Sequence, residues 1–179
     1  MPLSPWKKIR QVFELGNPWW EYRKDEVLLP SGKTGEYHFV HTPGSSMIIP
    51  VLDDGNLLLV NQYRYLANRE SLEFPCGSVK DGSSYEDTAR QELAEETGFQ
   101  AKDLPCVTEF NPYNGITDEI CKVFIARGLT RFSVKHDETE EFELLQLAPA
   151  KLQDYIRSGK IWDGMTLAAW ALVKHRLMK

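Results

Sequence analysis

The sequence predicts an α/β fold, namely an α/β/α sandwich with a mixed β-sheet, preceded by a β-rich N-terminal extension. Two observations lead to this class. Between Tyr22 and Tyr63, short apolar segments separated by turn residues are typical of strands, whereas three later segments have apolar residues at helical spacing. The order is therefore a β-rich region, a helix, further strands and two closing helices, which places helices on both faces of a sheet.

The N-terminal part of the chain contains two predicted pairs of strands. Residues 30–33 (Pro-Ser-Gly-Lys) and 53–55 (Asp-Asp-Gly) interrupt the strand pattern, and the second sequence is a strong signal for a β-hairpin. The unbroken apolar run at residues 57–60 further indicates a strand that is covered on both faces. The strands expected here are residues 22–29, 37–41, 47–52 and 57–63.

Residues 84–97 carry the start and stop signals of an α-helix. Ser83 and Glu86 form a predicted capping box, and Gly98 stands where glycine commonly ends a helix. The remaining predicted elements are strands at residues 107–110, 120–126 and 142–147 and helices at residues 149–158 and 165–177.

Composition indicates a folded protein of a reducing compartment. With 179 residues and 42% apolar side chains, the chain can bury a sizeable core, and its net charge of −5 argues against affinity for nucleic-acid phosphates. The cysteines, Cys76, Cys106 and Cys121, lack CxxC spacing and are expected to be reduced thiols. Residues 1–15 lack the apolar core of a signal peptide, and no apolar run approaches the roughly 18 residues that span a membrane. The cytoplasm is the expected compartment, with neither a nucleic acid nor a membrane as partner.

Three glutamates gather on one edge of the predicted helix 84–97. Glu92, Glu95 and Glu96 stand at positions i, i+3 and i+4, where like charges destabilise a helix, and they lie near its negative C-terminal end. A bound cation would neutralise them, and oxygen ligands favour Mg²⁺ or Mn²⁺. The alternative is a solvated acidic face that Arg90 and Lys102 partly screen.

Residues 77–99 resemble the Nudix box, the family signature G-x5-E-x7-R-E-U-x-E-E-x-G-U, in which U is a bulky apolar residue. Two positions depart from it, since Ser83 stands where the family has Glu and Gln91 stands where it has Arg. The family Arg holds the catalytic carboxylates by a charge-assisted contact, whereas Gln brings no charge, so weaker metal binding or a lower rate is expected. The matching residues are Gly77, Glu92, Leu93, Glu95, Glu96, Gly98 and Phe99.

This resemblance implies that Glu92, Glu95 and Glu96 hold Mg²⁺ or Mn²⁺, with the carbonyl of Cys76 as a further ligand. Outside the box, the chain resembles the ADP-ribose pyrophosphatase branch of the family, which also contains hydrolases of GDP-mannose and other nucleoside diphosphate sugars. That branch implies a homodimer in which an N-terminal extension, residues 1–45, contributes to dimerisation and base binding, followed by a Nudix domain at residues 46–179. The runs that carry this resemblance are residues 28–37, 61–65, 72–77 and 115–119.

The same resemblance assigns residues to the substrate. Arg64 is expected to clamp a phosphate, with Glu73 in the same substrate-binding set, and Trp19 and Tyr37 are expected to contact the base. Two other interpretations stay open. Without the family match, Arg64 is more typical of a surface salt bridge at a strand end. The aromatic residues are equally typical of a core or a dimer interface.

The acidic stretch at residues 137–141 precedes the last predicted strand, and such a charge run is usually a solvated loop. In this branch, a loop at that place often supplies the carboxylate that orients or deprotonates the attacking water. By resemblance, Glu140 is the first candidate and Glu138 the second, and His136 is a weaker one.

The predicted function is metal-dependent hydrolysis of the diphosphate of a nucleoside diphosphate sugar, ADP-ribose first and GDP-mannose next, giving a nucleoside monophosphate and a sugar phosphate. Glu92 and Glu96 count among the catalytic residues because they would hold the metals. One alternative is a Nudix-fold module that binds a nucleotide sugar without turnover, which Ser83 and Gln91 favour. Others are a hydrolase of another nucleoside diphosphate derivative and a protein whose acidic helix is purely structural.

Overall fold

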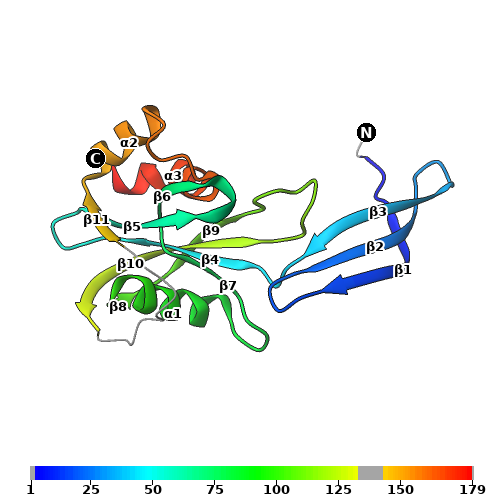
Figure 1. Ribbon diagram of the computed structural model, residues 1–179, viewed down its shortest axis with the longest axis horizontal. Helices are drawn as coiled ribbons and strands as arrows, with labels where there is room; N and C mark the ends of the chain where they lie inside the picture. Colours follow the sequence, from blue (N-terminus) through cyan, green and yellow to red (C-terminus); the bar gives the residue numbers. More distant parts are fainter. Residues whose placement is uncertain (1–2, 133–142, 179) are drawn as a thin grey trace. The chain divides into compact units, whose positions relative to one another are not determined.

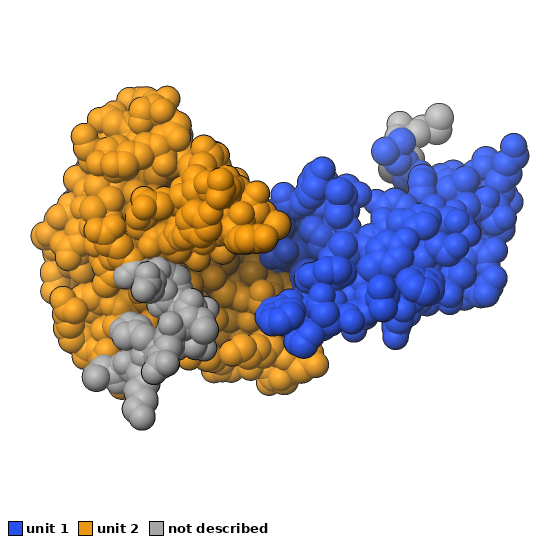
Figure 2. Space-filling view, viewed as in Figure 1, with its two compact units in different colours: residues 1–43, 111–120 blue, residues 44–110, 121–179 orange. Residues whose placement is uncertain are grey.

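The computed structural model describes residues 3–132 and 143–178, and it confirms the predicted α/β class with sheets of several strands (Figure 1). The chain forms two compact units, coloured separately in Figure 2. Unit 1 consists of residues 1–43 and 111–120, and unit 2 consists of residues 44–110 and 121–179.

Unit 1 is built on an antiparallel sheet in the order β1 (Lys7–Gly16), β2 (Glu21–Leu28) and β3 (Thr34–His41). Gly32 closes the turn between β2 and β3, where its φ of +79° favours glycine and its N–H donates to Leu29 O at 2.9 Å. The sequence does not predict β1, because this strand is exposed at every position and two register shifts interrupt its pairing with β2. A strand without a buried face has no alternating apolar pattern to reveal it.

Unit 2 contains a mixed sheet in the order β7 (Cys76–Ser78), β4 (Ser45–Pro50), β10 (Cys121–Arg131) and β8 (Phe99–Asp103). Strand β9 (Cys106–Phe110) also pairs with β10. Strands β4 and β10 run parallel, whereas the other pairs of this sheet are antiparallel. All six residues of β4 are buried, as expected for a strand that is covered on both faces.

Helix α1 (Tyr85–Thr97) covers one face of the mixed sheet. Its Ala89 and Leu93 pack with Ile48 of β4 and Phe124 of β10 in one apolar cluster. This packing fixes which edge of α1 turns away from the sheet, and the box glutamates lie at the C-terminal end of the same helix.

The opposite face carries a second sheet, in the order β11 (Glu143–Leu147), β5 (Leu57–Arg64) and β6 (Arg69–Glu73). Helices α2 (Pro149–Arg157) and α3 (Gly164–Leu177) lie on this side, opposite α1 (Figure 1). The two sheets and the two helices share a large apolar core, whose members include Met47, Leu59, Ile125, Leu152 and Trp170. None of the helices in the described parts of the chain combines the length and apolar character that crossing a bilayer requires.

The turn at residues 53–55 forms as predicted, but the antiparallel pairing of the predicted hairpin extends over a single bridge. Leu52 N–H donates to Asn56 O at 2.9 Å, and Val51 and Leu57 form an isolated antiparallel bridge. Beyond that bridge, β4 pairs with β7 and β10, whereas β5 pairs with β6 and β11. Local turn residues set the reversal of the chain, and burial in two different sheets decides the pairing.

The start of α1 also differs from the prediction by one residue. Ser84 is the N-cap, because its Oγ accepts the Asp87 N–H at 3.1 Å and donates to the Asp87 carboxylate at 2.7 Å. Glu86, expected to pair with Ser83 in a capping box, instead binds Arg90 at 2.7 Å. The turn before α1 places Ser84, the second of the two serines, beside the unpaired backbone N–H groups of the first helical turn.

Replacing Ser84 with Ala removes the acceptor of the Asp87 N–H, so we expect the free energy of unfolding to fall by about 1 kcal/mol. Ser83→Ala is the matched control, and at this exposed site the expected change is below about 0.5 kcal/mol. Urea denaturation followed by circular dichroism measures both values. Equal losses in the two variants would contradict the assignment of the cap to Ser84.

Candidate functional site

Two glutamates of α1 meet the chain at the start of β7. Glu96 is only 8% exposed, and its carboxylate accepts the Cys76 backbone N–H at 3.2 Å. Glu92, one helical turn earlier, lies against Gly77, where an added Cβ would be 2.0 Å from the Glu92 Cδ. Gly77 therefore leaves space for a carboxylate to approach the backbone, and its own backbone angle is not one that favours glycine.

The third glutamate of the box is held within the helix itself. Gln91 donates from Nε2 to Glu95 Oε1 at 2.9 Å, across one helical turn. The residue that stands in the place of the family Arg thus contacts a box carboxylate through an uncharged hydrogen bond. Arg90 is turned away from this edge and binds Glu86, so it does not replace the missing charge.

The donors at this place suit a hard divalent cation. Glu92 and Glu96 bring carboxylates to the backbone of residues 76–77, and Mg²⁺ in proteins is commonly bound by one or two carboxylates together with waters and substrate phosphates. In residues 3–132 and 143–178, no group of three or more His, Cys, Asp or Glu side chains converges tightly enough to hold an ion. The geometry therefore fits a site that water and substrate complete.

A charged pair lies at the ends of β5 and β6. Glu73 is 3% exposed, and Arg64 binds it with two bonds, Nε to Oε1 at 2.9 Å and a terminal nitrogen to Oε2. The hydrogen bond with Glu73 raises the pKa of Arg64, desolvation lowers it, and the charges of Glu73, Asp163 and Glu96 raise it further. The charged form of Arg64 is therefore favoured, chiefly by its hydrogen bond with Glu73.

The two predicted base-contacting aromatics, Trp19 and Tyr37, belong to unit 1. Trp19 precedes β2 and is 70% exposed, and Tyr37 lies on β3 with its ring edge-on to Trp6 at 5.9 Å. Both side chains are exposed, so neither is a core residue of the described chain. Their contact with a base stays a prediction.

The candidates for activating water, Glu140, Glu138 and His136, lie outside the residues that the structure describes. Their part in the reaction stays a prediction as well.

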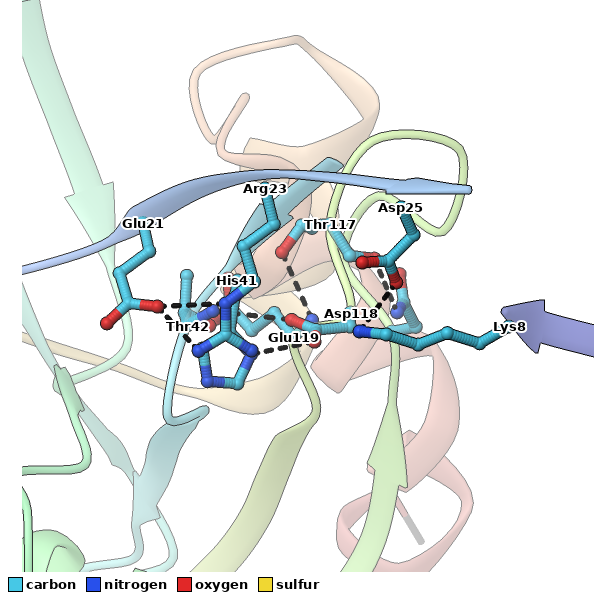
Figure 3. Close-up of polar contacts among 10 residues, drawn as sticks. Lys8, Glu21, Arg23, Asp25, His41, Thr42, Thr117, Asp118 and Glu119 are labelled. Atoms are coloured by element: carbon cyan, nitrogen blue, oxygen red, sulfur yellow. Dashed lines mark hydrogen bonds and ion pairs between the residues drawn. The ribbon is translucent and has the colours of Figure 1, made fainter. Parts of the chain in front are cut away.

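The sequence did not indicate a polar cluster of unit 1, which Figure 3 draws. His41 Nδ1 lies 2.7 Å from Asp118 Oδ2, the other oxygen of Asp118 accepts the Thr42 N–H at 3.3 Å, and Glu119 N–H donates to Thr117 Oγ1 at 3.1 Å (Figure 3). These contacts fasten the segment 111–120 to the end of β3. Residues 115–119 are part of the family resemblance. The sequence pattern did not reveal the contacts of Asp118, because its partners, His41 and Thr42, are more than 70 positions away in the chain.

Comparison with known proteins identifies the family to which the chain belongs. A model of the NUDIX domain matches residues 42–162. An ADP-ribose pyrophosphatase of Bacillus subtilis is 34% identical over 148 residues, which cover 81% of this chain and 80% of the relative. A methanol dehydrogenase activator of Bacillus methanolicus is 31% identical over 147 residues, with 81% and 80% covered. A crystal structure of an ADP compounds hydrolase has a TM-score of 0.84 over 99% of this chain and 96% of the other, and its 21% identity makes this a likeness of fold.

Gly77→Ala places a methyl group where the Glu92 carboxylate lies, so we expect that carboxylate to move and divalent metal to bind more weakly. A tenfold loss of affinity would reduce the stabilisation by saturating Mg²⁺ by about 1.4 kcal/mol. Melting temperatures with and without Mg²⁺ measure this effect. Gly164→Ala is the control, because a Cβ there meets nothing within 4 Å. The same metal-dependent rise in both variants would argue against the role given to Gly77.

Proposed function

Because the chain belongs to the Nudix family and is an enzyme of its pyrophosphohydrolase class, we propose that it hydrolyses the diphosphate of a nucleoside diphosphate sugar. ADP-ribose is the first candidate substrate, with AMP and ribose 5-phosphate as products, and GDP-mannose is the second. The observation that carries the proposal is the meeting of Glu92 and Glu96 at residues 76–77, a few residues along the chain from Glu73, which binds Arg64. A diphosphate bound there would lie between a cation and a guanidinium.

We propose that the carboxylates of Glu92 and Glu96 hold the metal, and the family resemblance adds Glu95 and the Cys76 carbonyl as further ligands. The bound Mg²⁺, or Mn²⁺, would offset phosphate charge and lower the pKa of a coordinated water. Neighbouring groups of the protein orient these carboxylates. The Cys76 N–H fixes one oxygen of Glu96, and the Gln91 amide fixes one oxygen of Glu95, so the lost charge at position 91 leaves an orienting contact in place.

Arg64 is proposed as the phosphate clamp. Its bonds to Glu73 use two of the five N–H donors of a guanidinium, and its side chain is 46% exposed. Glu73 therefore orients Arg64 through one edge while the other donors can reach a phosphate. Glu140, or Glu138, is proposed to position or deprotonate the attacking water.

The substrate class rests on likeness as well as on geometry. The relative from Bacillus subtilis is an ADP-ribose pyrophosphatase, which supports ADP-ribose over other nucleotide sugars. Trp19 and Tyr37 are proposed to stack on the base, a contact that tolerates adenine and guanine alike. The proposed compartment is the cytoplasm.

The test is the release of AMP from ADP-ribose in the presence of Mg²⁺, with GDP-mannose, ADP-glucose and UDP-glucose in parallel. We expect ADP-ribose to be hydrolysed fastest and Glu96→Gln to lower kcat on the order of 100-fold, because the variant loses a buried carboxylate that would hold the metal. Glu86→Gln, on the exposed side of the same helix and paired with Arg90, is expected to retain kcat.

Equal rates for Glu96→Gln and the wild type would reject the assignment. Binding of ADP-ribose without turnover in Mg²⁺, Mn²⁺ and Co²⁺ would instead favour the non-catalytic module.

We also propose that the protein is a homodimer formed through unit 1. Strand β1 is an edge of its sheet, it is exposed along its whole length, and its exposed side chains include Ile9, Val12 and Phe13. Exposed apolar edge strands are normally covered, and a second copy of the chain can cover this one.

Light scattering is expected to give twice the 20.6 kDa of one chain for the wild type, and a reduced mass for Ile9→Asp. A single-chain mass for the wild type at micromolar concentration would contradict the dimer.

A further inference from the structure

The segment between β6 and β7 joins the two halves of the candidate site. Glu73, the partner of Arg64, ends β6, and Cys76, whose N–H binds Glu96, begins β7. Phe74 and Pro75 alone separate them. Any contact that fixes these two residues therefore sets the position of the arginine clamp relative to the carboxylate of Glu96.

One such contact comes from the start of α3, which lies beside β6 (Figure 1). The hydroxyl of Thr166 accepts the Phe74 backbone N–H at 3.2 Å, although 92 residues separate the two along the chain. Thr166 has no exposed surface, and Phe74 is fully buried as well. A buried N–H needs an acceptor, so this bond holds the segment in one position.

The hydroxyl itself is held by a well-anchored helix end. Asp163 is the N-cap of α3, and its carboxylate accepts the Thr166 N–H at 2.7 Å. The preceding residue, Trp162, donates from its indole nitrogen to Glu70 O at 3.1 Å, and the Arg69 guanidinium lies 3.7 Å from the centre of its ring. The start of α3 is thus fastened to both ends of β6.

A second tether lies on the other side of the segment. Ile48 N–H, in the central strand β4, donates to Pro75 O at 2.8 Å. Phe74 and Pro75 are therefore held from two layers of the fold, by a backbone bond to the sheet and by a side-chain bond to α3. Of these two bonds, a substitution can remove the side-chain bond alone.

We propose that Thr166 is a positioning residue of the reaction, whose hydroxyl sets the placement of Glu73 and Cys76 and through them of Arg64 and Glu96. This inference rests on the proposed function, since it concerns the same site. Thr166 does not touch the substrate in this role. A threonine kept for packing alone would tolerate valine, which has nearly the same shape and lacks the hydroxyl.

The test compares Thr166→Val with Thr166→Ser, by kcat and KM for ADP-ribose in Mg²⁺ and by amide hydrogen exchange at Phe74 and Cys76. We expect valine to lower kcat about tenfold or more, because small displacements of reacting groups are costly, and to speed exchange at both amides. Serine keeps the hydroxyl and is expected to retain kcat within about threefold, with both amides protected.

Ser71→Ala is the matched control. Ser71 also lies near the segment and is buried, but its hydroxyl has no hydrogen-bond partner among the described residues. Its removal is expected to leave kcat and exchange at Phe74 and Cys76 unchanged. A loss in this variant equal to that of Thr166→Val would overturn the specific role of Thr166.

A folded Thr166→Val protein with the kcat of the wild type overturns the proposal, as does an equal loss in the serine variant. If the valine variant does not fold, Thr166→Ala takes its place under the same criteria. Absence of turnover by the wild type would count against the proposed function instead. In that case unchanged exchange at Cys76 in Thr166→Val overturns the inference, and faster exchange supports it.

Discussion

The carboxylate of Glu96, held by the backbone N–H of Cys76, is the contact on which the candidate site depends. A carboxylate that is nearly buried is costly unless hydrogen bonds or a cation compensate it, and this bond supplies part of that compensation. The bond also joins the last turn of α1 to the start of β7. Because Ala89 and Leu93 lock α1 onto the sheet, the position of Glu96 follows from the packing of the core.

Around this contact, charges of opposite sign are arranged in a small region. Arg64 is bound by Glu73, and this hydrogen bond, together with neighbouring negative charges, raises the pKa of Arg64 and fixes its orientation before any ligand arrives. An arginine held in this way needs little reorganisation to meet a phosphate. Gly77 serves the same end by leaving space for Glu92, which a larger residue would displace.

The departures from the family signature have different consequences in the structure. Ser83 does not cap α1, because Ser84 does, so the change at position 83 leaves the helix start intact. Gln91 retains a hydrogen bond to Glu95 and lacks only the charge of arginine. Both changes therefore leave in place the contacts that the structure describes around them.

Features that depend on local geometry could be predicted from the residues alone. Helical periodicity placed Glu92, Glu95 and Glu96 on one edge of α1, Gly98 ended that helix, and the apolar run at residues 57–60 is buried as expected. The three helices and the strands with apolar faces were predictable for the same reason. Strand β1 and the short strands β6, β7 and β8 were not, since they lack a full period of apolar residues or a buried face.

Contacts between distant parts of the chain, in contrast, depend on how the layers of the fold pack. Strands β4 and β5 belong to different sheets. The bond from Cys76 to Glu96 and the bond from Phe74 to Thr166 join segments that are up to 92 residues apart. No propensity or spacing encodes such pairs, because each arises from layers that pack to bury the shared core and from buried amides that need acceptors. The sequence named the chemical groups of the site, and packing determined their partners.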